Sequence, residues 1–329
     1  MRKVNGLLNH MALSVLMATG GAALAGERTP DVKPQLQILS AEHFSAATTA
    51  QILAATRVGP RVVAVGDHGV VLISDDAGRR YRQARTVPVS STLTAVSFAD
   101  DRTGWAVGHW GAIMKTTDGG ETWTLQRSDT SVDQPLFSVY FKDAREGWAV
   151  GLWSLMLHTT DGGTTWSTVK LPPPRGQKKA DRNLYAVFSD GKGGLVVACE
   201  QGRVIRSADG GNTWTYAETG YTGSFWTGVA LRDGVLLVGG LRGTIYRSTD
   251  GGGTWQRVQT SFRSSVTDIV QGADRRVVAV GLDGVSLESR DEGVSFTGRQ
   301  RPDRTALTAV VDVGAGTPVL FSTNGPTGQ

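Results

Sequence analysis

One eight-residue motif recurs through this chain and constrains its fold more than any other feature. It reads Thr-Thr-Asp-Gly-Gly-Glu-Thr-Trp at residues 116–123, and related copies stand at 74–81, 159–166, 207–214, 248–255 and 289–296. Aspartate accepts hydrogen bonds from the backbone of its own turn, and glycine supplies the positive φ that a tight turn needs. The motif therefore predicts the tip of a β-hairpin, and we assign it a structural role.

The spacing of the copies indicates how many structural units the chain contains. Each copy carries one aspartate, and the four most regular copies close on tryptophan: Asp76, Asp118, Asp161, Asp209, Asp250 and Asp291, with Trp123, Trp166, Trp214 and Trp255. The aspartates are 42, 43, 48, 41 and 41 residues apart, and we interpret Asn324, 33 residues further on, as a degenerate seventh copy. A period in the low forties with several strands per unit is typical of a β-propeller, in which neighbouring blades cover each other's faces.

Each unit shows the same order of predicted strands. In the unit that ends on residues 116–123, an inner strand at 93–98 precedes a second at 104–108 and a two-residue turn at 109–110, and a third strand leads into the motif. We therefore predict an all-β fold, a single seven-bladed β-propeller of four-stranded antiparallel blades over residues 26–329. The last motif lacks a following strand, so residues 36–39 are predicted to close the ring as an N-terminal strand; a flexible linker is the alternative.

The first 25 residues have the features of a signal peptide. Arg2 and Lys3 form a basic start, residues 11–18 are mostly apolar, and Ala23-Leu24-Ala25 is a small-x-small cleavage site. The apolar run is too short for a permanent membrane anchor, and the alternative is a buried N-terminal helix. We expect export to a periplasm-like space, with no membrane insertion after cleavage.

Charge and residue spacing argue against several classes of function. Lysine and arginine total 34 against 30 acids, and without Arg2 and Lys3 the excess is 32 − 30 = +2, which argues against a nucleic-acid partner. The histidines show no metal-ligand spacing, so we predict no metal and no cofactor. The single cysteine, Cys199, excludes an internal disulfide.

The motifs together resemble a known family. The pattern Gly-Trp-Ala-Val-Gly followed by Thr-Thr-Asp-Gly-Gly-x-Thr-Trp, at 104–123 and 147–166, is similar to that of the BNR or Asp-box propellers and, more narrowly, of the photosystem II stability/assembly factors. The resemblance implies a seven-bladed, non-enzymatic scaffold that holds a newly made membrane protein client during assembly. It extends over essentially the whole chain after residue 25.

The resemblance and the loop positions suggest where a client binds. Propeller geometry places the two-residue turns and the links between blades on the face opposite the aspartate motifs, and loops on a rigid scaffold commonly carry function. Arginine and aromatic side chains contribute disproportionately to interfaces. The predicted partner-binding residues are His109, Trp110, Trp153, Arg175, Lys178, Lys179, Arg242, Phe262 and Arg263; for any one charge, a solvated loop is the alternative.

The alternative function is that of a sialidase-like or other Asp-box glycoside hydrolase. The Arg-Ile-Pro element typical of sialidases is replaced by Arg-Val-Gly-Pro-Arg at residues 57–61, and core packing accounts best for the candidate nucleophile Tyr140. A hydrolase with two carboxylates needs a pair of acids across the channel mouth, for which Asp67, Glu200 and Asp283 are candidates. We predict no catalytic residue.

Overall fold

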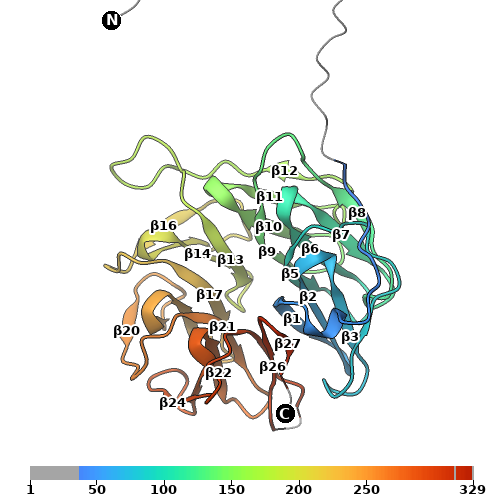
Figure 1. Ribbon diagram of the computed structural model, residues 1–329. Helices are drawn as coiled ribbons and strands as arrows, with labels where there is room; N and C mark the ends of the chain where they lie inside the picture. Colours follow the sequence, from blue (N-terminus) through green and yellow to red (C-terminus); the bar gives the residue numbers. More distant parts are fainter. Residues whose placement is uncertain (1–36, 315, 328–329) are drawn as a thin grey trace, which may run out of the picture. The chain divides into compact units, whose positions relative to one another are not determined.

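Antiparallel hairpins account for nearly all regular structure in this chain. The computed structural model describes residues 37–314 and 316–327. The predicted signal peptide at residues 1–25 lies outside the described residues and stays a prediction. The propeller unit, residues 36–329, consists of seven antiparallel sheets in which consecutive strands pair, which confirms the predicted seven-bladed β-propeller (Figure 1).

Six blades have four strands, and the seventh has three described strands. Each blade runs from the inner strand outward, and the inner strands surround the centre of the ring (Figure 1). The strands are β1 Ile52–Val58, β2 Arg61–Gly66, β3 Val71–Ser74 and β4 Arg82–Gln83; β5 Leu93–Phe98, β6 Gly104–Gly108, β7 Ile113–Thr116 and β8 Thr124–Arg127; β9 Leu136–Phe141, β10 Gly147–Gly151, β11 Met156–Thr159 and β12 Ser167–Thr168; β13 Leu184–Ser189, β14 Leu195–Cys199, β15 Arg203–Ser207 and β16 Thr215–Glu218; β17 Phe225–Ala230, β18 Leu236–Gly240, β19 Ile245–Ser248 and β20 Gln256–Val258; β21 Val266–Gln271, β22 Val277–Gly281, β23 Val285–Ser289 and β24 Thr297–Gln300; β25 Leu307–Val311, β26 Val319–Ser322 and β27 Gly325–Pro326.

Short 3-10 turns join the second and third strands of blades 1 to 6. They are η2 Asp67–Gly69, η3 His109–Gly111, η4 Leu152–Ser154, η5 Glu200–Gly202, η6 Leu241–Gly243 and η7 Leu282–Gly284; a further turn, η1 Ala47–Thr49, precedes β1. In each of η2 to η7 the middle residue has a left-handed backbone, as at Trp110 (φ 59°) and Trp153 (φ 52°). Because the strands are antiparallel, these turns and the aspartate motifs lie at opposite ends of the blades, here named the turn face and the motif face.

The predicted seventh copy of the motif, at Asn324, is wrong. Ser322 pairs with Leu307 at the start of β25, as Gly108 pairs with Leu93 in blade 2, so Ser322 ends a second strand. Asn324 therefore occupies the turn position that Trp110 holds in blade 2. That position precedes the motif aspartate by eight residues, which explains why the last step was 33 residues and not about 41.

The predicted closure of the ring by an N-terminal strand is also wrong. Residues 37–39 form no strand, and the residues after them follow blade 1, where the Ala41 N–H donates to the Val87 carbonyl (3.0 Å). The ring closes through side chains, since one buried cluster joins Leu72 of blade 1 with Phe321 of blade 7. The edge of blade 7 meets η1: a Cβ on Gly325 would lie 1.9 Å from the Thr48 carbonyl oxygen, so the two backbones touch.

The inner strand has the same irregularity in every blade. Its second residue is a β-bulge, left unpaired between the first and third residues, and its side chain is half-buried in all seven blades. Bulges re-aim side chains. The bulged residues are Leu53, Thr94, Phe137, Tyr185, Trp226, Thr267 and Thr308. Because each lies at the start of its strand, they stand near the turn face.

Candidate functional site

Each aspartate motif on the motif face is held together by hydrogen bonds to its own aspartate. In blade 3 the Thr159 hydroxyl donates to Asp161 Oδ1 (2.8 Å), the Thr165 N–H donates to the same oxygen (2.9 Å), and the Thr165 hydroxyl donates to Oδ2 (2.6 Å). These donors, the Thr165 hydroxyl first, lower the pKa of Asp161 to about 2. Equivalent bonds hold the other five motif aspartates, Asp76, Asp118, Asp209, Asp250 and Asp291. Both carboxylate oxygens are occupied by the turn itself.

The tryptophans that close the motifs pack inside the blades. Trp123, Trp214 and Trp255 are buried, and each indole N–H donates to the carbonyl of the glycine three residues earlier (2.9–3.1 Å). Trp166 is half-buried and stacks edge-on against Phe141. These side chains are therefore part of the scaffold.

The turn face places the predicted partner-binding residues around the ring and not at one point. His109 and Trp110 belong to blade 2, Trp153 to blade 3, and Arg242 to blade 5. Three more cations, Arg175, Lys178 and Lys179, are exposed near the tip of the link between β12 and β13, the loop that projects beyond those strands in Figure 1. The five predicted cations Arg175, Lys178, Lys179, Arg242 and Arg263 form no ion pair within the part of the chain that the structure describes.

Two of the predicted aromatic contacts are partly engaged by the protein itself. Phe262 packs against the core of blade 6, where a Cβ on Gly298 would lie 2.1 Å from its ring. Trp110 is half-buried and lines a hollow of about 190 Å³ together with Ile38. By contrast, the Trp153 side chain is 58% exposed.

Sequence reasoning predicted Trp153 as a partner-binding residue but missed three aromatic side chains that the fold places on neighbouring inner strands. Phe137, Tyr185 and Trp226 are bulged residues of three consecutive blades, and Trp153 stands on the turn face of the first of them. The Phe137 and Tyr185 rings stack with centroids 5.5 Å apart and planes 20° apart. We name these four residues the aromatic sector. The sequence contained a signal for this grouping, because Phe137, Tyr185 and Trp226 are each the second residue of an inner strand.

Asn183 connects this sector across the seam between blades 3 and 4. Its side-chain oxygen accepts a hydrogen bond from the backbone N–H of Trp153 (3.1 Å). Its side-chain nitrogen donates to the Tyr185 hydroxyl (3.4 Å) and to Glu200 Oε1 (3.2 Å). The Asn183 N–H donates to Glu200 Oε2 (3.0 Å). The backbone that carries Trp153 is therefore fixed, although its side chain is open to solvent.

The three candidate acids of a hydrolase are spread over the turn face. Asp67 accepts a hydrogen bond from Thr92 (3.1 Å) and Asp283 from Ser264 (3.1 Å), and Glu200 is held by Asn183. They belong to blades 1, 6 and 4. Asp67 binds the link that precedes the inner strand of blade 2, whereas Asp283 and Glu200 bind the links that precede the inner strands of their own blades. The three acids therefore hold their turns in place, and they stand on blades that are not neighbours in the ring.

Features of other site classes were sought in the described residues. Within residues 37–314 and 316–327, no cluster of three or more histidine, cysteine or acidic side chains is arranged to hold a metal ion. No helix in this part of the chain has the length and apolar character needed to cross a bilayer.

The family comparison agrees with the fold. The family model described as photosynthesis system II assembly factor YCF48 matches residues 83–227, and that of the BNR/Asp-box repeat matches residues 246–257. The resemblance to the photosystem II assembly factors is confirmed. No curated protein matches the chain.

Several solved structures share the architecture of this propeller. "YCF48 bound to D1 peptide" superposes with a TM-score of 0.69 at 18% identity, covering 88% of this chain and 98% of that one. YCF48 from Cyanidioschyzon merolae gives 0.66 at 16% identity, covering 85% and 94%. The Cps50 (Swd1) β-propeller domain of Myceliophteria thermophila gives 0.66 at 14% identity, covering 83% and 94%. At these identities the likeness shows the fold.

Proposed function

We propose that this YCF48-like propeller is a non-enzymatic scaffold that holds a protein client on its turn face, over the aromatic sector. The observation that carries the proposal is the sector itself: four aromatic side chains on three adjacent blades, one of them 58% exposed, on a backbone that hydrogen bonds hold in place. Aromatic anchors on a rigid support are what an interface hot spot requires.

Charge and similarity support the same face. The cations Arg175, Lys178, Lys179 and Arg242 belong to blade 5 and to the link between blades 3 and 4, and blades 3 to 5 are the ones that carry the aromatic sector. An interface of this kind favours an extended segment with aromatic or apolar anchors and acidic residues nearby. One of the similar structures is a YCF48 propeller bound to a D1 peptide, which supports the proposal that the client of this chain is a protein. We infer that the client is a membrane protein undergoing assembly.

Export is part of the same proposal. The basic start, the apolar run and the small-x-small site within residues 1–25 support cleavage near Gly26 and a periplasmic or lumenal location. Cell fractionation and N-terminal sequencing of the purified protein test this. A product that keeps residues 1–25 and fractionates with the cytoplasm contradicts it.

Affinity capture from solubilised host membranes tests client binding. The wild-type chain from residue 26 is compared with a triple variant, Trp153→Ala, Tyr185→Ala and Arg242→Ala, and with the matched control Leu125→Ala, an exposed residue of β8. We expect the wild type and the control to retain the same membrane protein and the triple variant to lose at least ten-fold of it. Equal recovery by the triple variant, at unchanged thermal stability, overturns the proposed face.

A further inference from the structure

Residues 38–44, which precede β1, lie fixed along blade 1, and we name this segment the wall. The Ala41 N–H donates to the Val87 carbonyl (3.0 Å), and the Phe44 N–H donates to Gln83 Oε1 (3.2 Å). The Gln83 side-chain nitrogen donates to the Glu42 carbonyl (2.9 Å), and a His43 ring nitrogen lies 3.0 Å from the Arg85 carbonyl oxygen. Four hydrogen bonds within four residues hold this segment against the blade.

The wall turns large apolar side chains toward solvent. Ile38 and Ala41 pack inward against the core shared by blades 1 and 2, whereas Leu39 is 63% exposed and Phe44 is 40% exposed. Exposed apolar side chains that gather in one place mark an interaction site more often than single ones do. Because the backbone is pinned, Leu39 and Phe44 are held in this exposed position.

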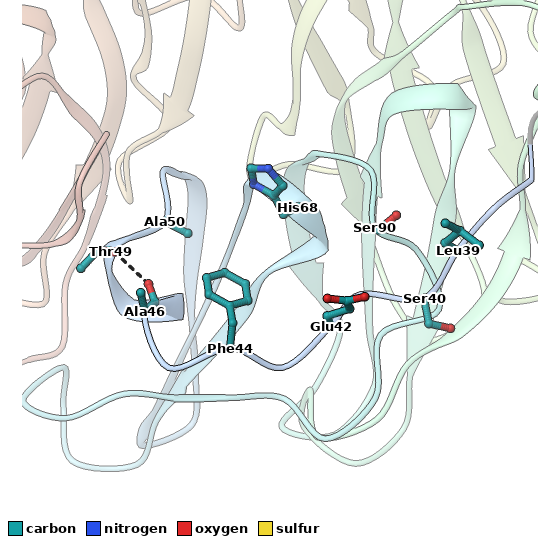
Figure 2. A pocket seen from close by; sticks show the side chains of 9 residues that line it. All are labelled: Leu39, Ser40, Glu42, Phe44, Ala46, Thr49, Ala50, His68 and Ser90. Carbon is teal, nitrogen blue, oxygen red and sulfur yellow. Dashed lines mark hydrogen bonds between the residues drawn. The ribbon is translucent and has the colours of Figure 1, made fainter.

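These residues line an open cavity of about 500 Å³ between the wall and the turn face of blade 1 (Figure 2). Leu39, Phe44, Ala46 and Ala50 supply apolar surface, and His68 and Ser90 border it from η2 and from the link that follows β4. The hollow beside Trp110 shares Leu39 and Ser90 with this cavity. The two hollows form a groove across blades 1 and 2, named here the lead-in groove.

The charge of the lead-in groove restricts what it can accept. Glu42 is the acid that lines the larger cavity, and its exposed carboxylate makes no ion pair within the described residues. A neighbouring positive charge would be favoured there, whereas an anionic lipid surface would be repelled. Two adjacent hollows suit a partner polypeptide in an extended conformation, because its side chains project at regular intervals.

We propose that the lead-in groove binds an extended polypeptide segment in which a bulky apolar side chain stands next to a lysine or arginine. The apolar side chain fills the cavity between Leu39 and Phe44, and the basic residue reaches Glu42. The proposal rests on the proposed function, because it names chemistry that a protein client must carry. It also places part of the client outside the aromatic sector, on blades 1 and 2.

The test uses a phage-displayed library of random nine-residue peptides as the probe. The library is selected on the wild-type chain after depletion on a variant with Leu39→Ser and Phe44→Ser. We expect the surviving peptides to be enriched in a large apolar residue adjacent to Lys or Arg. Selection on Glu42→Lys is expected to replace the basic residue with Asp or Glu.

Fluorescence anisotropy with the best labelled peptide gives the magnitude. Leu39→Ser combined with Phe44→Ser is expected to weaken binding at least ten-fold and Glu42→Gln about three-fold, while the control Val294→Ser, exposed on the motif face, leaves it unchanged. All three replaced residues are exposed, so the variants are expected to fold, and thermal unfolding checks this. Selected peptides without the apolar-basic pair, or binding unaffected by these changes, overturn the proposal.

Two further outcomes would assign the groove to another occupant and also overturn it. Self-association that depends on Leu39 and Phe44 in sedimentation assigns it to a second copy. Tighter peptide binding by a chain that begins at residue 36 assigns it to residues 26–35 of the chain itself. Membrane capture by the aromatic-sector variant is a separate readout, so the sector and the groove can fail independently.

Discussion

Two tryptophans at the same place in the repeat provide a sharp test of how the blades are held together. Trp105 and Trp148 each follow the first glycine of Gly-Trp-Ala-Val-Gly, and each is at most 1% exposed. The Trp105 indole N–H donates to the Gly162 carbonyl of the next blade (3.1 Å). The Trp148 N–H has no acceptor within the described residues.

Replacing each tryptophan by phenylalanine separates the packing from the hydrogen bond. The lost volume is the same in both variants, so the cavity contribution largely cancels in the comparison. Trp105→Phe loses a hydrogen bond with a net value of about 1 kcal/mol, and the Gly162 carbonyl keeps two other donors, Lys115 Nζ (3.0 Å) and Gln126 Nε2 (3.2 Å). Trp148→Phe removes a buried unpaired donor that costs about 1–3 kcal/mol.

We therefore expect Trp105→Phe to destabilise the fold by about 2–4 kcal/mol more than Trp148→Phe does. Equilibrium urea unfolding at 25 °C measures this as a difference in midpoint, provided that the slope is the same for both variants. A Trp148→Phe variant that is as unstable as Trp105→Phe, or less stable, refutes the reasoning. It would show that indole packing alone decides both positions.

Three other predictions concern ionisable groups. Burial raises the pKa of Asp268 to about 6, so its carboxyl is protonated in the folded chain and ionised in the unfolded chain between about pH 4 and 6; stability falls as pH rises through this range, and Asp268→Asn should remove that part of the slope in urea midpoints. Hydrogen bonds from Arg82 hold the pKa of Glu121 below its ordinary value, and Glu121→Gln should cost about 1 kcal/mol at pH 7, with the gap to wild type closing below about pH 4; a constant gap excludes the ion pair as the cause. Hydrogen bonds from Thr165 lower the pKa of Asp161 to about 2, so the ionised carboxylate stabilises the wild type above about pH 4 and this stabilisation is lost as pH falls toward 2. The difference in thermal stability between the wild type and Asp161→Asn should therefore shrink progressively toward pH 2.

The repeated motif alone was sufficient to predict the propeller. Its aspartate, glycines and aromatic residue act within one turn, so their positions along the chain report local structure directly. A constant step between copies then fixes how many hairpins stack side by side. For the same reason the misplaced seventh copy, at Asn324, could have been recognised from its short step of 33 residues.

The tertiary structure decided where the side chains meet. Phe137, Tyr185 and Trp226 are more than forty residues apart from one another in sequence, yet they come to one sector because each is bulged at the same point of adjacent inner strands. The path of residues 37–50 likewise depends on hydrogen bonds to Gln83 and Val87, which lie much further along the chain. No local pattern in the sequence therefore indicates this path. Local chemistry sets the repeat, whereas strand register and long-range packing determine which surface the protein offers to a partner.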